Sequence, residues 1–166
     1  MKSILRFVLQ GLVGLSIACS GGGSGGSSGP TGPAGVTTNG DYEGLQSFRT
    51  HIRLVDVRTG AATAEDDCLG DIRIVIDDTA AKVITGDGRC DLVLSRNGAT
   101  YSIVGGFLND TDIEGVIAIE FSGVTHRLGF TGNVVRNRVR AAFTGRTGQT
   151  SRLGVDWNGD FTATRI

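Results

Sequence analysis

Residues 48–54 read FRTHIRL, and charged or imidazole side chains alternate with uncharged ones throughout this stretch. Phe48 and Leu54 fall on one side of the alternation, whereas Arg49 and Arg53 fall on the other. Because successive side chains of a β-strand point to opposite faces, this period of two predicts a strand with one buried face. The arginines on the other face argue against contact with lipid, so we expect a water-soluble sheet.

The same alternation recurs through the rest of the chain, and turn residues interrupt it about every 8–12 positions. Further strands are expected around residues 72–76, 83–85, 92–94, 99–108, 113–121, 128–134, 138–145, 153–157 and 161–164. Asn97-Gly98 and Asn158-Gly159 are dipeptides typical of tight hairpin turns. The pattern therefore predicts an all-β domain of about eight short antiparallel strands.

Short connections between successive strands favour an up-and-down meander. Closing such a meander into a barrel leaves no exposed sheet edge, so a single antiparallel up-and-down β-barrel is the predicted fold. A β-sandwich of the immunoglobulin type is the alternative. The composition agrees with either, because the 27 glycines supply turns and the chain has only two prolines.

The beginning of the chain has the pattern of a cleaved signal peptide. Lys2 and Arg6 provide positive charge, and residues 4–18 form a mainly apolar run that is too short and interrupted for a spanning helix. Residues 15–19 read LSIAC, which resembles the lipobox of bacterial lipoproteins, with small Ala18 directly before the cysteine. The chain is therefore expected to be exported.

The lipobox resemblance implies that Cys19 begins the mature chain and carries a diacylglycerol thioether, often with a further acyl chain such as palmitate. Only a thiolate is nucleophilic enough for this chemistry near neutral pH, and two or three acyl chains anchor a protein stably. Ser16 departs from the pattern, because leucine is commonest at that position. Ser20 is not the aspartate that retains such lipoproteins in the inner membrane, so the resemblance implies the outer membrane of the cell envelope.

Three segments follow from these observations. Residues 1–18 are the predicted signal peptide, residues 19–40 hold the lipidated cysteine and a flexible Gly/Ser/Pro linker, and residues 41–166 form the β-barrel domain. A linker of this composition has a reach of about 25 Å for about 20 residues.

An aromatic residue next to glycine or threonine recurs near the end of the chain, in residues 128–132 (LGFTG), 142–145 (AFTG) and 158–165 (NGDFTATR). This looks like the small β-barrel domains of bacterial surface lipoproteins, including transferrin-binding-protein-B-like barrels and other calycin-like lipoproteins of unknown function. The resemblance implies a fold more than a function, and no transferrin-binding residue is carried over.

Lipidation of Cys19 would leave Cys68 and Cys90, an even pair in an exported chain. Such a pair in an oxidising compartment predicts a disulfide. A hairpin centred on Thr79 would support it, because residues whose numbers sum to 158 would then pair and the two cysteines would face each other. Two buried free thiols are the alternative.

Four carboxylates surround the first of these cysteines in sequence, at Glu65, Asp66, Asp67 and Asp71. A calcium loop is one interpretation, and an ordinary solvated loop is the favoured one. We therefore expect no metal and no cofactor.

The chain has two histidines, His51 and His126, and both are expected on the surface. A catalytic triad would require one of them to meet a serine and a carboxylate, and nothing in the spacing suggests it. The protein is therefore predicted not to be an enzyme.

Residues 121–155 contain arginines but neither aspartate nor glutamate. Arg136, Arg138 and Arg140 alternate, so they are expected to share one face of a strand. Such a stripe suits anionic headgroups, lipopolysaccharide or an acidic protein, although a solvated outer strand is the simpler interpretation. Nucleic acid is not an expected partner outside the cytoplasm.

Together these features predict a lipid-anchored envelope protein without enzymatic activity that acts as a surface or periplasmic interaction or structural module. The alternative is a lipocalin-like carrier of a small apolar ligand inside the barrel. The two differ in the barrel interior, which side chains fill in the first case and which encloses a cavity in the second.

Overall fold

The computed structural model describes residues 38–77, 79, 82–148, 150 and 152–166. The predicted signal peptide and lipidation site at Cys19 therefore lie outside the described residues. Within them, the chain forms eight strands: β1 (Gly40–Asp56), β2 (Ala62–Asp77), β3 (Val83–Leu92), β4 (Gly98–Phe107), β5 (Asp112–Phe121), β6 (Val124–Val135), β7 (Arg138–Gly148) and β8 (Leu153–Arg165).

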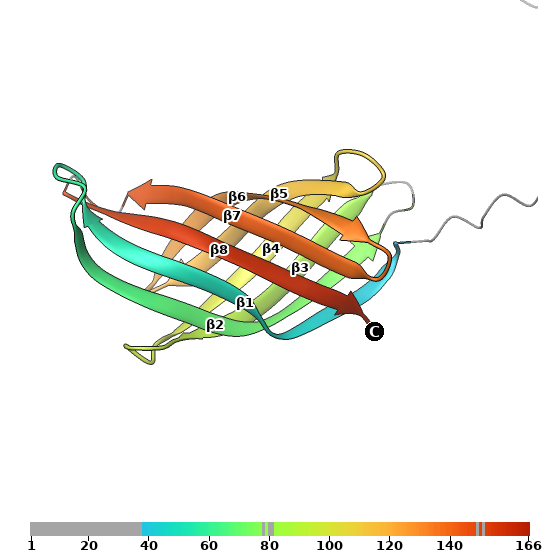
Figure 1. The fold of residues 1–166 in the computed structure, drawn as a ribbon, viewed down its shortest axis with the longest axis horizontal. Coiled ribbons are helices and arrows are strands. Elements are labelled where there is room, and N and C mark those ends of the chain that lie inside the picture. Colours follow the sequence, from blue (N-terminus) through green and yellow to red (C-terminus); the bar gives the residue numbers. More distant parts are fainter. Residues whose placement is uncertain (1–37, 78, 80–81, 149, 151) are drawn as a thin grey trace, which may run out of the picture. The chain divides into compact units, whose positions relative to one another are not determined.

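Each strand pairs with the next in antiparallel orientation, and β1 also pairs with β8, so the sheet closes into a barrel (Figure 1). This confirms the predicted all-β, up-and-down barrel and excludes the sandwich. No membrane-crossing helix is found in the described part of the chain.

Side chains from all eight strands fill the interior of the barrel. The ring of Phe48 stacks on Tyr101, with the ring centroids 3.9 Å apart, and lies 5.8 Å from the ring of Phe143. Phe130 and Phe161 meet edge to face at 5.6 Å. The buried residues of the described chain are otherwise mostly Ile, Val, Leu and Ala, and such close packing leaves the barrel a solid core.

A bulge in β1 sets how this strand fits between its two neighbours. Gly44 pairs with Ile72 and Phe48 with Gly70, so β1 uses two more residues than β2 over this step. The ladder with β8 shows the same excess of two. At the bulge, the backbone of Gln46 is left-handed (φ 52°) and its N–H donates to a carboxylate oxygen of Asp71 at 2.6 Å.

The turn predicted at Asn158-Gly159 is wrong, because β8 runs through it without a break. Gly159 is instead an inward position on a crowded part of the wall. A β-carbon there would collide with the ring of Phe143 and would lie 2.7 Å from the carbonyl oxygen of Arg49. The glycine therefore makes room for a neighbouring aromatic ring.

The predicted register of the β2–β3 hairpin is also wrong. Paired residues have numbers that sum to 160, so Cys68 lies opposite Leu92, and Cys90 lies opposite Gly70. The cause is the connection, which spans residues 78–82 rather than three residues centred on Thr79.

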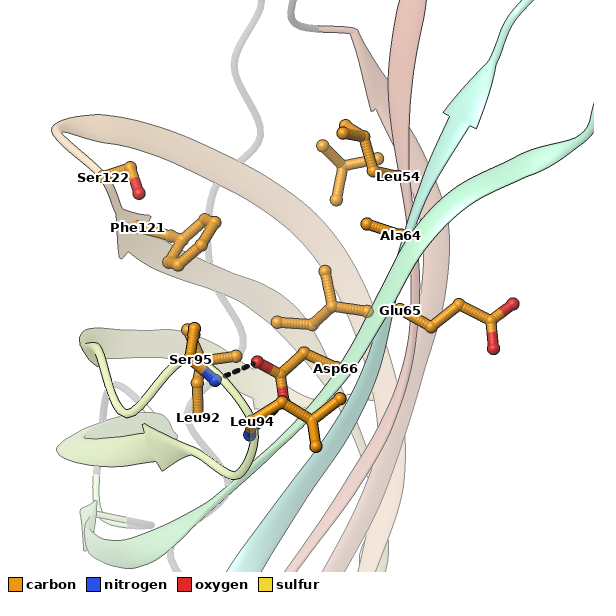
Figure 2. A pocket seen from close by; sticks show the side chains of 11 residues that line it. Leu54, Ala64, Glu65, Asp66, Leu92, Leu94, Ser95, Phe121 and Ser122 are labelled. Atoms are coloured by element: carbon orange, nitrogen blue, oxygen red, sulfur yellow. Dashed lines mark hydrogen bonds between the residues drawn. The ribbon is translucent and has the colours of Figure 1, made fainter.

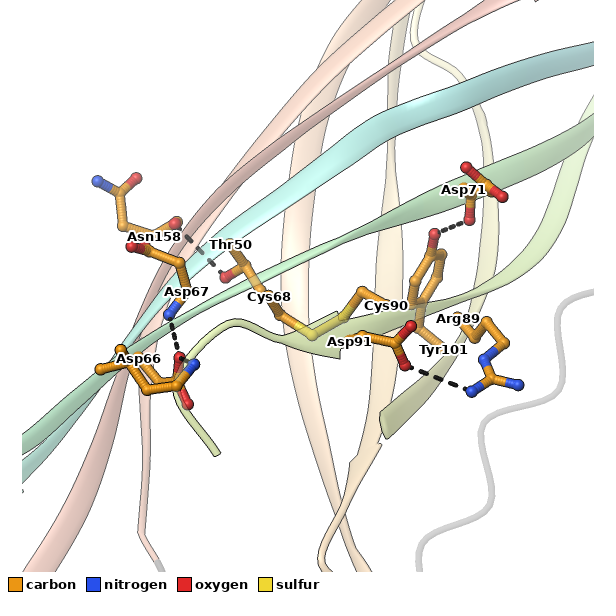
Figure 3. The surroundings of a disulfide bond; sticks show 11 residues. Thr50, Asp66, Asp67, Cys68, Asp71, Arg89, Cys90, Asp91, Tyr101 and Asn158 are labelled. Atoms are coloured by element: carbon orange, nitrogen blue, oxygen red, sulfur yellow. Dashed lines mark hydrogen bonds and ion pairs between the residues drawn. A yellow bond between two sulfur atoms is a disulfide. The ribbon is translucent and has the colours of Figure 1, made fainter. Parts of the chain in front are cut away.

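The structure nevertheless joins Cys68 and Cys90 in a disulfide, with the sulfur atoms 2.07 Å and the Cα atoms 5.5 Å apart (Figure 3). The two cysteines occupy diagonal positions on neighbouring strands, which fits the usual Cα separation of a disulfide. Gly70 makes this approach possible, because a β-carbon there would lie 2.5 Å from the Cα of Cys90.

Replacing both cysteines in Cys68→Ala/Cys90→Ala is expected to lower the free energy of unfolding by about 3 kcal/mol, because the crosslink restricts the unfolded chain. Urea denaturation of the two proteins measures the difference. A reductant should lower the stability of the wild type and leave that of the double variant unchanged. Equal stability of the two oxidised proteins would contradict the structural role of the bond.

Candidate functional site

The two ends of the barrel differ in what they carry. We call the end where β1 begins and β8 finishes the linker end; the β2–β3, β4–β5 and β6–β7 connections also lie there. The opposite end, which we call the far end, carries the connections 57–61, 93–97, 122–123 and 149–152. The backbone N–H of Val57 donates to the carbonyl oxygen of Arg152 at 2.8 Å and links two of these far-end turns.

A pocket of about 540 Å³ opens at the far end (Figure 2). Its apolar walls come from five strands and the turn after β3: Ile52, Leu54, Ala64, Leu92, Leu94, Phe121 and Val155. Ile52, Leu92 and Val155 are buried core residues and form its base, whereas Leu94 is 75% exposed. We call this opening the far-end pocket.

Asp66 holds one wall of the far-end pocket in place. Its carboxylate accepts hydrogen bonds from the backbone N–H groups of Leu94 (2.9 Å) and Ser95 (3.0 Å). Burial raises the pKa of Asp66, but these hydrogen bonds and one from the N–H of Asp67 outweigh it, so the pKa is lowered overall. The acid therefore fixes the β3–β4 turn.

His126 is buried, so its predicted surface position is wrong. Its Nδ1 lies 2.6 Å from the hydroxyl oxygen of Thr147, and the Nε1–H of Trp157 donates to the same oxygen at 2.9 Å. The signal was present in the sequence, because His126 shares an alternation with Leu128 and Phe130. The residues on either side of His126 are polar and belong to the opposite, outward face of the strand.

The two ring nitrogens of His126 differ in their surroundings. Nδ1 shares a hydrogen bond with the hydroxyl of Thr147, whose oxygen also accepts from Trp157. Nε2 is buried and has no partner among the described residues. Burial lowers the pKa of His126, because the charged form would lose its hydration.

This cluster also bridges two strands where their backbones are not paired. The ladder between β6 and β7 runs from Val135 opposite Arg138 to Phe130 opposite Phe143. Nearer the far end, the contact between His126 and Thr147 connects the same two strands through side chains.

The three predicted arginines do not share one face. Arg138 and Arg140 point outward from β7, but Arg136 lies in the turn before it and has a left-handed backbone (φ 57°). Thr164 and Thr162 of β8 stand beside the two strand arginines. The described residues provide no ion pair to any of the three. The alternation predicted a strand where the chain already turns.

The four carboxylates near Cys68 do not converge on one point. Glu65 pairs with Arg53 at 2.9 Å and Asp67 with His51 at 2.8 Å, both on the outer surface. Asp66 holds its turn, and Asp71 holds the β1 bulge. The part of the chain that the structure describes has no group of three or more His, Cys, Asp or Glu placed to hold a metal ion.

No family model and no curated protein matches this chain. Among solved structures, it is similar to the vaccine antigen transferrin-binding protein B of Haemophilus parasuis Hp5, with a TM-score of 0.50 and 11% identity. The similarity is one of fold. It covers 78% of this chain but only 27% of that protein, and it agrees with the resemblance to transferrin-binding-protein-B-like barrels.

The buried His126 predicts a specific pH dependence of stability. Because its pKa is lowered in the folded state, the unfolded chain binds more protons below the ordinary histidine pKa of about 6.5. The free energy of unfolding should therefore fall as the pH drops from 7 to 5, with a slope that approaches about 1.4 kcal/mol per pH unit. Asp56 and Asp66, whose pKa values are also lowered, should contribute only near pH 4 and below.

Urea denaturation across this pH range measures the slope. His126→Leu should remove most of it, whereas His51→Gln, at the exposed histidine, should leave it intact. A slope that follows His51 instead would contradict this assignment.

Proposed function

We propose that this protein is a lipid-anchored protein of the bacterial cell envelope whose barrel is a non-enzymatic interaction module. The observation that carries the proposal is the filled barrel interior, formed by the buried side chains of all eight strands. A filled interior leaves the outer face and the two ends as the surfaces that can meet a partner. The packing of the core gives no support to a carrier that would hold its ligand deep inside the barrel.

The anchor is inferred from sequence. The LSIAC stretch ending at Cys19 carries the lipidation proposal, and Ser20 favours the outer membrane. The proposed division is a signal peptide (1–18), a linker (19–40) and a barrel domain (41–166), and the start of β1 at Gly40 supports only the last boundary.

The fold supports a binding role by analogy. Transferrin-binding protein B is by its name a binding protein, and a similar barrel forms part of it. Fold alone does not determine function, so the analogy supports the class of interaction module and no particular partner.

Arg138 and Arg140 are the surface we propose for an anionic partner. Their neighbours across the sheet on β8 and β6 are Thr164, Thr162, Val135 and Asn133, so no carboxylate stands directly beside them. An acidic protein or an anionic headgroup would supply the missing opposite charge.

Mass spectrometry of the protein extracted from its own membrane tests the anchor. The mature chain is expected to begin at Cys19, to carry the mass of a diacylglycerol and further acyl chains, and to be two hydrogens lighter than the reduced form. Cys19→Ser should release the protein from the membrane fraction. An unmodified wild-type chain would overturn the lipoprotein assignment.

Binding to vesicles tests the arginine surface. The chain from residue 19 with Cys19→Ser, which lacks lipid, is expected to bind phosphatidylglycerol vesicles more tightly than phosphatidylcholine vesicles. Arg138→Ser/Arg140→Ser should weaken binding about tenfold or more, since each arginine near such a surface contributes about 1 kcal/mol. The control, Arg58→Ser/Arg152→Ser, removes two arginines from the far-end turns. An equal loss of vesicle binding in the control would show that binding depends on the net charge of the protein and not on this surface.

A further inference from the structure

We propose that the far-end pocket is a binding site for a small, uncharged, largely apolar molecule. The site lies beyond the filled core and depends neither on lipidation nor on Arg138 and Arg140. It therefore adds a ligand to the interaction module, held at the open end of the barrel, where the core residues Ile52, Leu92 and Val155 form the base of the pocket.

The first step of the argument is the arrangement of the walls. Figure 2 shows Phe121 on one side of the opening and Leu54 and Ala64 on the other, with Leu92 and Leu94 at a third side. Leu54 and Phe121 are only partly buried, and Leu94 is 75% exposed. An apolar occupant would remove these surfaces from water, which is the general driving force for binding apolar ligands.

The second step concerns charge. Glu65 extends away from the pocket (Figure 2). Its carboxylate forms an ion pair with Arg53. Asp66 faces the β3–β4 turn, where its carboxylate oxygens accept hydrogen bonds from the backbone N–H groups of Leu94 and Ser95. An anionic ligand would be repelled by this carboxylate, and a cationic ligand would compete with hydrogen bonds that it already makes. The site therefore favours an uncharged ligand.

The third step concerns size. The volume of about 540 Å³ falls within the range of small-molecule sites and exceeds that of a single inserted side chain by a wide margin. A molecule of two or three rings, or a folded acyl chain, matches the space better than one residue of a partner protein.

Fluorescence titration with N-phenyl-1-naphthylamine, an uncharged apolar probe, tests the proposal on the chain from residue 19 with Cys19→Ser. Saturable binding of one probe per chain is expected. 1-Anilinonaphthalene-8-sulfonate has nearly the same aromatic body with a negative charge, and it should bind at least tenfold more weakly. Equal or tighter binding of the sulfonate would overturn the preference for an uncharged ligand.

Two variants locate the site. Leu94→Asp places a charge on an exposed wall, and Ala64→Trp fills the opening. Each variant should bind the uncharged probe at least tenfold more weakly. The matched control is Leu108→Asp, because Leu108 is also exposed, at 59%, but lies in the β4–β5 turn at the linker end. Near-UV circular dichroism checks that each variant keeps its packing.

Absence of saturable binding, or an equal loss in Leu108→Asp, would overturn the site. Neither outcome would affect the lipid anchor or the arginine surface, which are tested separately. Loss in Leu94→Asp and Ala64→Trp with retention in Leu108→Asp would establish the far-end pocket as the binding site.

Discussion

The pairing of β1 with β8 is the constraint on which the rest of the structure depends. This ladder runs from Tyr42 opposite Arg165 to Asp56 opposite Leu153, and it removes the two edges that an open meander would expose. It must accommodate the bulge before Phe48. Because the bulge adds two residues, side chains before and after it keep the same facing; an excess of one would have turned Phe48 outward.

Closure also determines where function can reside. In a closed barrel, all inward side chains share one interior, so large rings need positions without a side chain beside them. Gly159 provides such a position next to the ring of Phe143. The core becomes solid, so binding is confined to the outer surface and the ends. His126 and Thr50 are the buried polar side chains of the described core, and Nε2 of His126 is buried there without a partner among the described residues. An unpartnered buried nitrogen costs free energy, whereas Nδ1 keeps its hydrogen bond to Thr147.

The sequence was sufficient for the fold class because alternation is a local property, visible in FRTHIRL alone. It was insufficient wherever a distant strand decides the outcome. Asn158-Gly159 has turn chemistry, yet the ring of Phe143 requires that glycine within a strand. The pairing of the two cysteines could be predicted, but the register of the β2–β3 hairpin depended on the length of the connection between these strands. The far-end pocket could not be foreseen, because its residues are spread from Ile52 to Val155 and only closure brings them together.

The two proposed surfaces lie at different places along the barrel, and the point where the linker joins gives this a physical meaning. Arg138 is in the same cross-strand row as Thr164 of β8 and Glu43 of β1, close to the start of the barrel at Gly40. The chain enters the barrel at this end, at Gly40, so Arg138 lies at the end of the barrel to which the segment with the proposed anchor connects. The far-end pocket lies about 40 Å away along β1 and has apolar walls. Electrostatic attraction at one end and apolar burial at the other are thus suited to different surroundings, and a single short barrel can serve both.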